Sequence, residues 1–154
     1  MSEKYSTRDI AISGVFIAVY VVLTMINPLS FGAVQFRTAA IISVLPLFVK
    51  KLKIAGVLGV AIANLWSPFG FIDVVFGCSI WLITYYLLDR IPVSRYIIAV
   101  LSGIVAALLV AAEILIVAGG KYLPLFIGIL IPQEIAMLLG CFIFSKMRNI
   151  IEKW

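Results

Sequence analysis

Residues 96–118 read YIIAVLSGIVAALLVAAEILIVA, and Glu113 is the single charged residue in this stretch. An α-helix rises 1.5 Å per residue, so about 20 apolar residues cross the roughly 30 Å hydrocarbon core of a bilayer. The stretch therefore predicts a membrane-spanning helix.

The rest of the chain has the same character. Of its 154 residues, 64% are hydrophobic and 12% charged, and its mean hydropathy of +1.22 is far above that of a soluble domain. We therefore expect an all-α integral membrane protein, a six-transmembrane-helix bundle forming one domain over residues 1–154. The predicted helices cover about residues 10–27, 37–49, 54–66, 73–88, 96–118 and 123–145.

Positive charges indicate the orientation of the bundle. If both termini share one side, ten of the twelve lysines and arginines lie on that side, and Arg37 and Lys121 lie opposite. By the positive-inside rule, both termini are then cytoplasmic. The cations stand at the ends of apolar runs and form no basic stripe, so we expect no nucleic-acid partner.

The composition also argues against catalysis. The chain has no histidine, which excludes a histidine metal ligand and a Ser-His-Asp or Cys-His arrangement. Its two cysteines, Cys78 and Cys141, each lie in an apolar run and suggest neither a zinc cluster nor a disulfide. We expect no enzyme, no metal site and no cofactor in this chain.

Polar residues in or beside the apolar runs are the main functional signal. A charge near the bilayer centre costs about 2.5 to 3.5 kcal/mol on insertion scales, so such residues usually face a cavity or a partner. Glu134, which we expect to lie deepest, is the strongest candidate. Carboxylates at such a depth favour a donor-rich, cationic ligand. The candidates, all expected in the outer half, are Arg37, Asn64, Asp73, Glu113, Gln133 and Glu134.

Each of these residues also has a structural interpretation. Arg37 and Asp73 open helices at the interface, where such charges are ordinary. Glu113 is close enough to the Gly119-Gly120 break to reach water, and a structural hydrogen bond would satisfy Glu134.

Aromatic residues beside the expected outer loops offer stacking surfaces for a planar ring, with interfacial anchoring as the alternative role. Trp66 is the candidate included in the site, and the others are Phe36, Phe69 and Phe71.

The first predicted helix carries a stripe of small residues, Ala11, Gly14 and Ala18. Small residues at this spacing allow close helix packing in membranes. The stripe is suited either to packing inside the bundle or to docking on another subunit.

These residues resemble a known family: the substrate-capture (S) components of energy-coupling factor transporters, of the queuosine-precursor type. The resemblance runs over most of the chain, and its most specific segment is Asp73 to Gly77 with Asn64 upstream. Its other anchors are Ala33-Val34-Gln35-Phe36-Arg37, Val44-Leu45-Pro46, Ala63-Asn64-Leu65, Gly70-Phe71-Ile72, Ala112-Glu113 and Glu134-Ile135.

The resemblance implies a multi-pass protein of a prokaryotic plasma membrane that captures a deazaguanine precursor of queuosine outside and delivers it inward. A transmembrane coupling (T) subunit and two ATPases would power it, with ATP used by those partners. The first helix would dock on the T subunit through Ala11, Gly14 and Ala18. The absence of a G-x-x-x-x-G-K-[ST] motif from this chain agrees with that division of labour.

One departure concerns the ligand. The family usually places a glutamate within a few residues of the arginine of the second helix, whereas this chain has Ala39 and Ala40 there. A different queuosine-related form, such as queuine or the nucleoside, is therefore an open alternative. So are an S component for another vitamin-like compound and a solitary proton-coupled transporter that uses Glu113 and Glu134.

Overall fold

The structure, a computed structural model, describes residues 5–31 and 35–151, and within those ranges its regular elements are all helical. Ala33 and Val34 of the family segment lie outside the described residues. The α-helices are α1 (Thr7–Ile26), α2 (Ala39–Ser43), α3 (Leu45–Phe48), α4 (Lys53–Asn64), α5 (Phe71–Leu82), α6 (Arg95–Ala118), α7 (Tyr122–Lys146) and α8 (Arg148–Ile151). Three further turns are the 3₁₀ helices η1 (Lys50–Leu52) and η3 (Leu88–Arg90) and the π-helical η2 (Ile83–Leu87).

Helix length separates the expected membrane spans into two groups. By length and composition, four stretches of the described residues can cross a membrane: Thr7–Ile26, Phe71–Arg90, Arg95–Ala118 and Tyr122–Lys146. These spans make the chain a helical membrane protein. The stretches Ala39–Phe48 and Lys53–Asn64, expected as the second and third crossings, are shorter. At 1.5 Å per residue they reach about 15 and 18 Å, roughly half of a hydrocarbon core, so the count of six stays a prediction.

The expected helix over residues 37–49 is divided into α2 and α3 at Val44. Pro46 lies in the first turn of α3 and has no backbone N–H to donate, which interrupts the helical ladder. The Ser43 carbonyl instead accepts a hydrogen bond of 2.7 Å from the Tyr85 hydroxyl. A side chain from another helix thus stabilises the break.

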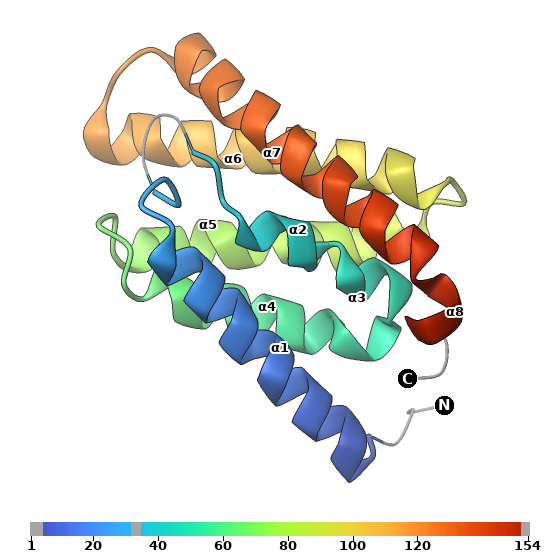
Figure 1. Ribbon diagram of the computed structural model, residues 1–154. Coiled ribbons are helices and arrows are strands. Elements are labelled where there is room, and N and C mark those ends of the chain that lie inside the picture. Colours follow the sequence, from blue (N-terminus) through green and yellow to red (C-terminus); the bar gives the residue numbers. More distant parts are fainter. Residues whose placement is uncertain (1–4, 32–34, 152–154) are drawn as a thin grey trace.

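The helices form a bundle in which α6 packs on α7, α1 on α4 and α4 on α5, while α2 contacts α1 and α7 (Figure 1). The starts of α1, α4 and α6 and the end of α7 lie at one end of the bundle (Figure 1). Every lysine and arginine that the structure describes, except Arg37 and Lys121, lies in segments at this cation-rich end.

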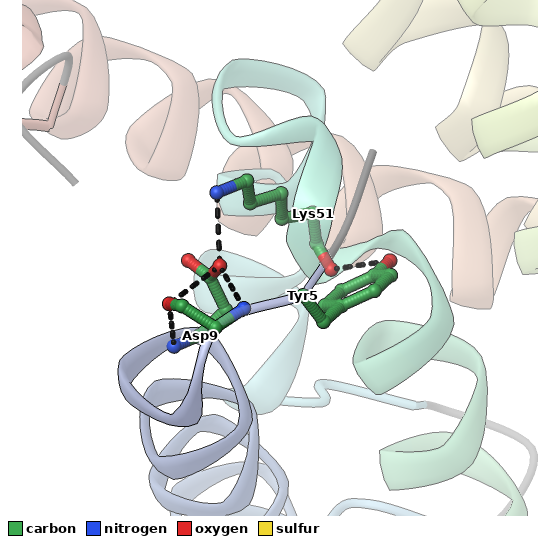
Figure 2. A network of polar contacts seen from close by, with 4 residues as sticks. Tyr5, Asp9 and Lys51 are labelled. Carbon is green, nitrogen blue, oxygen red and sulfur yellow. Dashed lines mark hydrogen bonds and ion pairs between the residues drawn. The ribbon is translucent and has the colours of Figure 1, made fainter. Parts of the chain in front are cut away.

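A polar network fixes the start of α1 at that end, as Figure 2 shows. Ser6 caps the helix, since its side chain accepts from Asp9 N and its own N–H donates to Asp9 Oδ2 at 2.8 Å. Asp9 is 6% exposed and also binds Lys51 Nζ at 2.9 Å. The Tyr5 hydroxyl donates to the Lys51 carbonyl at 3.3 Å. The network ties α1 to the turn η1.

Candidate functional site

A narrow cavity of about 20 Å³ lies among α1, α2, α5, α6 and α7, with Asp73, near the start of α5, in its wall. That volume holds about one water molecule. Three of the expected site residues line it: Arg37, Asp73 and Gln133. The full lining is Tyr20, Gln35, Arg37, Ala40, Asp73, Gly77, Ile80, Trp81, Ala106, Val110, Ile129 and Gln133.

Arg37 and Gln35 reach the cavity from the segment between α1 and α2. Both side chains donate to the Ser30 carbonyl, Gln35 Nε2 at 2.5 Å and Arg37 through Nε and a terminal nitrogen at 3.4 Å. The Arg37 guanidinium also lies 5.4 Å from the centre of the Phe31 ring. Because Arg37 makes no ion pair among the described residues, the segment's own backbone holds it.

Asp73 and Asn64 form the second part of the site. Asn64, the last residue of α4, donates through Nδ2 to the Asp73 backbone carbonyl at 2.9 Å and to Asp73 Oδ1 at 3.1 Å. A Cβ at Gly77 would lie 2.4 Å from Asn64 Nδ2, so the glycine leaves the space that the amide occupies. Asn64 Oδ1 and Asp73 Oδ2 are buried and have no hydrogen-bond partner in the described part of the chain.

Glu113 comes from α6 and is 1% exposed. Both of its carboxylate oxygens are buried without a hydrogen-bond partner within residues 5–31 and 35–151, and the group lies within electrostatic range of Asp73 and Arg37. The site thus combines two carboxylates with one guanidinium. Its unpaired acceptors and formal excess of negative charge are complementary to a ligand that carries N–H donors and a positive charge.

Four expected site residues do not line the cavity: Asn64 and Glu113, which interact with Asp73, and Trp66 and Glu134. Trp66 follows α4 and is 59% exposed. The Glu134 carboxylate is buried and has no hydrogen-bond partner among the residues that the structure describes, but it lies against α6, where a Cβ at Gly103 would be 2.3 Å from Glu134 Oε1. The polar group expected to be the chief ligand is therefore held between α6 and α7.

The structure adds Tyr20, Gln35 and Trp81, which the sequence analysis did not single out for the site. A usable signal exists for Trp81, because Asp73, Gly77 and Trp81 are spaced i, i+4, i+8 and so share one face of α5. Gln35 stands two residues before Arg37 in the family segment.

The small-residue stripe of α1 faces away from the bundle: Ala11, Gly14 and Ala18 are all exposed, and a Cβ at Gly14 would meet nothing within 4 Å. Ala11 also lines an apolar groove of about 390 Å³. The other residues of that groove are Ile12, Val15, Phe16, Val19, Ile42, Leu45, Leu52 and Phe144.

Comparison with known proteins identifies the family. A family model described as QueT transporter matches residues 10–149. Over 78 residues the chain is 36% identical to the queuosine precursor transporter QueT of Lactococcus lactis subsp. cremoris (strain MG1363). The match covers 49% of this chain and 46% of that protein, so it spans about half the length of the curated relative. No solved structure matches the chain.

Both the family and the relative are described as transporters, which confirms the expectation of a transport protein rather than an enzyme. The bacterial relative and the apolar helices agree with the predicted location, a prokaryotic membrane crossed several times. Because the family match covers nearly the whole sequence, this chain belongs to the QueT transporter family.

Proposed function

We propose that this chain is the S component of an energy-coupling factor importer and that it captures a 7-deazaguanine precursor of queuosine. The proposal depends above all on one observation: four buried acceptor atoms on Asp73 of the cavity wall and on two residues that interact with it, Asn64 and Glu113, have no hydrogen-bond partner among the described residues; they are Asn64 Oδ1, Asp73 Oδ2 and both carboxylate oxygens of Glu113. Buried polar atoms are nearly always paired in native proteins, so these atoms suit a donor-rich ligand.

The proposed ligand has the matching chemistry. The edge of a 7-deazaguanine ring offers a ring N–H and an amino group to carboxylate oxygens, and its carbonyl oxygen accepts from a donor such as Arg37 or Gln133. An aminomethyl substituent adds a cation that compensates the excess negative charge of Asp73 and Glu113. The name of the Lactococcus relative supports this ligand class.

Ligand entry requires one wall of the cavity to move, because about 20 Å³ does not admit a bicyclic ring. The wall that carries Gln35 and Arg37 is the stretch of residues 35–38, which precedes α2. Hydrogen bonds to Ser30, and one from the Asn27 amide to the Phe36 carbonyl, hold it in place. We expect residues 35–38 to shift when the ligand enters.

Membrane topology and partners complete the proposal. We assign six crossings with both termini in the cytoplasm, supported by the lysines and arginines gathered at one end of the bundle. Arg37 and Asp73 then lie toward the outer side of the membrane. The exposed stripe Ala11, Gly14 and Ala18 docks on the T subunit, and two ATPase partners use the ATP, so this chain itself holds no cofactor.

The form of the precursor is linked to Ala40. This residue lines the cavity close to where the family usually has a glutamate, so one carboxylate fewer faces the ligand. The test therefore includes queuine, the nucleoside and the aminomethyl-bearing base, together with 7-deazaguanine itself.

The proposal is tested by native mass spectrometry of gently purified protein, followed by thermal unfolding with each of these compounds. A ligand at 100 times its Kd stabilises the folded state by about 2.7 kcal/mol, so the melting temperature rises for the compound that binds. Asp73→Asn changes a carboxylate of the proposed site, so its melting temperature should rise less when the same compound is added. If none of the deazaguanine compounds shifts the melting temperature, the ligand assignment is rejected and another vitamin-like compound becomes the leading alternative.

Glu134 favours a second candidate function, a solitary proton-coupled carrier, because its buried carboxylate has no hydrogen-bond partner among the described residues and lies against Gly103 of α6. Uptake in cells without the ATPase partners distinguishes the two. An S component loses uptake in those cells, whereas a proton-coupled carrier keeps it until a protonophore collapses the gradient.

A further inference from the structure

The cavity has aromatic walls as well as polar ones. Tyr20 of α1 and Trp81 of α5 both line it, and they are 1% and 4% exposed. The other apolar lining residues are small or aliphatic: Ala40, Gly77, Ile80, Ala106, Val110 and Ile129. Flat ring surfaces therefore come from Tyr20 and Trp81.

Trp81 is supported from behind by a second aromatic ring. Its indole stacks on Tyr85, with ring centres 5.2 Å apart and planes inclined by 28°. Tyr85 is 1% exposed, and its hydroxyl donates to the Ser43 carbonyl. A side chain held in this way loses little conformational freedom when a ligand binds, which favours affinity.

The backbone around Tyr85 is built to hold that ring. A Cβ at Gly56 would lie 2.6 Å from Tyr85 Cε2, so α4 leaves space for the ring at this glycine. Tyr85 lies in the π-helical turn η2, and its carbonyl accepts a hydrogen bond of 2.6 Å from Lys53 Nζ. Turns of this kind occur frequently at functional sites.

The position of Trp81 relative to the polar residues suits a planar ligand. Asp73, Gly77 and Trp81 share one face of α5, and long helical side chains lean toward the N-terminus of their helix, here toward Asp73. Gly77 adds no side chain between them. A ring lying on the indole would thus direct its edge to the hydrogen-bonding groups around Asp73.

We propose that the indole of Trp81 is the surface on which the planar ring of the ligand stacks, which makes Trp81 a specificity-determining residue for flat heteroaromatic compounds. This inference rests on the proposed function, because it assumes that the cavity holds the ligand. The carboxylates select donors at the ring edge, and Trp81 selects the flat ring.

Affinity measurements on the full chain test the proposal, with the aminomethyl-bearing 7-deazaguanine base as probe. Trp81→Leu should lower the affinity at least about tenfold, equivalent to 1.4 kcal/mol, because stacking on an aromatic side chain contributes on that scale. Trp81→Phe keeps an aromatic ring and should lower the affinity less than Trp81→Leu does. Trp66→Leu is the matched control at a 59% exposed tryptophan and should bind like the wild type.

Fluorescence gives a second readout that leaves the cavity unaltered. The chain has three tryptophans, so the variant Trp66→Phe/Trp154→Phe retains Trp81 alone. The base should quench its emission saturably, with the Kd found by calorimetry. The converse variant, Trp81→Phe with Trp66 and Trp154 retained, should show no such change.

The outcomes separate the two proposals. If the wild type binds no deazaguanine compound, the proposed function fails and the stacking inference fails with it. If the wild type binds, but Trp81→Leu binds equally well or Trp81 emission does not respond, the stacking inference is overturned and the proposed function stands. Should Trp81→Leu not fold, Trp81→Phe and the fluorescence titration decide.

Discussion

At the scale of single residues, Glu113 and Glu134 illustrate how surroundings separate two similar carboxylates. Both lie in apolar helices, and all four carboxylate oxygens are buried and unpaired. Glu113 lies within electrostatic range of the cavity residues Arg37 and Asp73, whereas the Glu134 carboxylate lies against Gly103. Depth estimated from sequence ranks Glu134 first, but position relative to the cavity favours Glu113.

We predict that Glu113→Gln lowers affinity for the deazaguanine base at least about tenfold, since charged hydrogen bonds contribute about 1.5 to 3 kcal/mol. Glu134→Gln should change affinity less than about threefold, well under the 1.4 kcal/mol of a tenfold change. Isothermal titration of the two variants, with their ligand-free melting temperatures as a folding control, measures both. The opposite order would restore Glu134 as the principal ligand carboxylate.

The polar residues of the candidate site can be selected from sequence for a physical reason, whereas the aromatic residue can be selected only by its spacing from one of them. Arg37, Asp73, Glu113 and Gln133 stand out because polar groups are rare in apolar helices. Trp81 does not stand out by itself, because a helix that is apolar all round has no hydrophobic periodicity to show which face points inward. Its i, i+8 spacing from Asp73 is the usable signal. Trp66 is the tryptophan predicted for the site instead, because it lies beside an expected outer loop, but in the structure it is exposed.

At the scale of elements, helix ends follow from apolar length where nothing interrupts the run. The expected helices over 96–118 and 123–145 are observed as Arg95–Ala118 and Tyr122–Lys146, and that over 10–27 as Thr7–Ile26. The expected helix over 73–88 begins at Phe71 and becomes π-helical from Ile83. That change depends on contacts with α4, which sequence periodicity does not report.

The contact between α6 and α7 at Gly103 gives a prediction about helix packing. Gly103→Val should destabilise the protein by about 1 to 3 kcal/mol, the usual effect of overpacking, because the new side chain meets the Glu134 carboxylate. In a Glu134→Ala background, Gly103→Val should lower the free energy of unfolding by less. Thermal unfolding of the four proteins of this cycle measures the coupling, and strictly additive effects would show that the two residues do not touch.

The network at the start of α1 gives a second prediction at this scale. Asp9→Ala removes the acceptor for Ser6 N and the partner of Lys51 together, whereas Lys51→Ala removes only the ion pair. The Ser6 cap on the backbone N–H of residue 9 remains in Asp9→Ala, but the reciprocal bond from Ser6 N to the carboxylate is lost, and a hydrogen bond contributes about 0.5 to 1.5 kcal/mol. An ion pair with one partner at the surface contributes 1 kcal/mol or less. Asp9→Ala should therefore lower the melting temperature more. Equal losses would mean that the bond from Ser6 N contributes nothing.

At the scale of the whole molecule, the proposed function places capture and docking on different surfaces. The cavity with Asp73 in its wall lies inside the bundle, whereas Ala11, Gly14 and Ala18 are exposed on α1, and Ala11 lines the apolar groove. A transport cycle that joins an external ligand to internal ATP hydrolysis needs both surfaces. Substitutions in the cavity should therefore leave docking unchanged, and substitutions on the exposed face of α1 should leave ligand binding unchanged.

We predict that Gly14→Leu and Ala18→Leu keep wild-type affinity for the deazaguanine base but lose association with the T subunit. Close helix packing in membranes needs small side chains at the interface, and a Cβ at Gly14 would meet no described atom within 4 Å, so space around this position is open. Co-purification with the T subunit and both ATPases measures docking, and titration of the same samples measures binding. Val117→Leu, at an exposed position of α6 and so on another helix than the stripe, is the control. If both stripe variants still co-purify, the T subunit docks on another face, and the groove beside α1 has a different role.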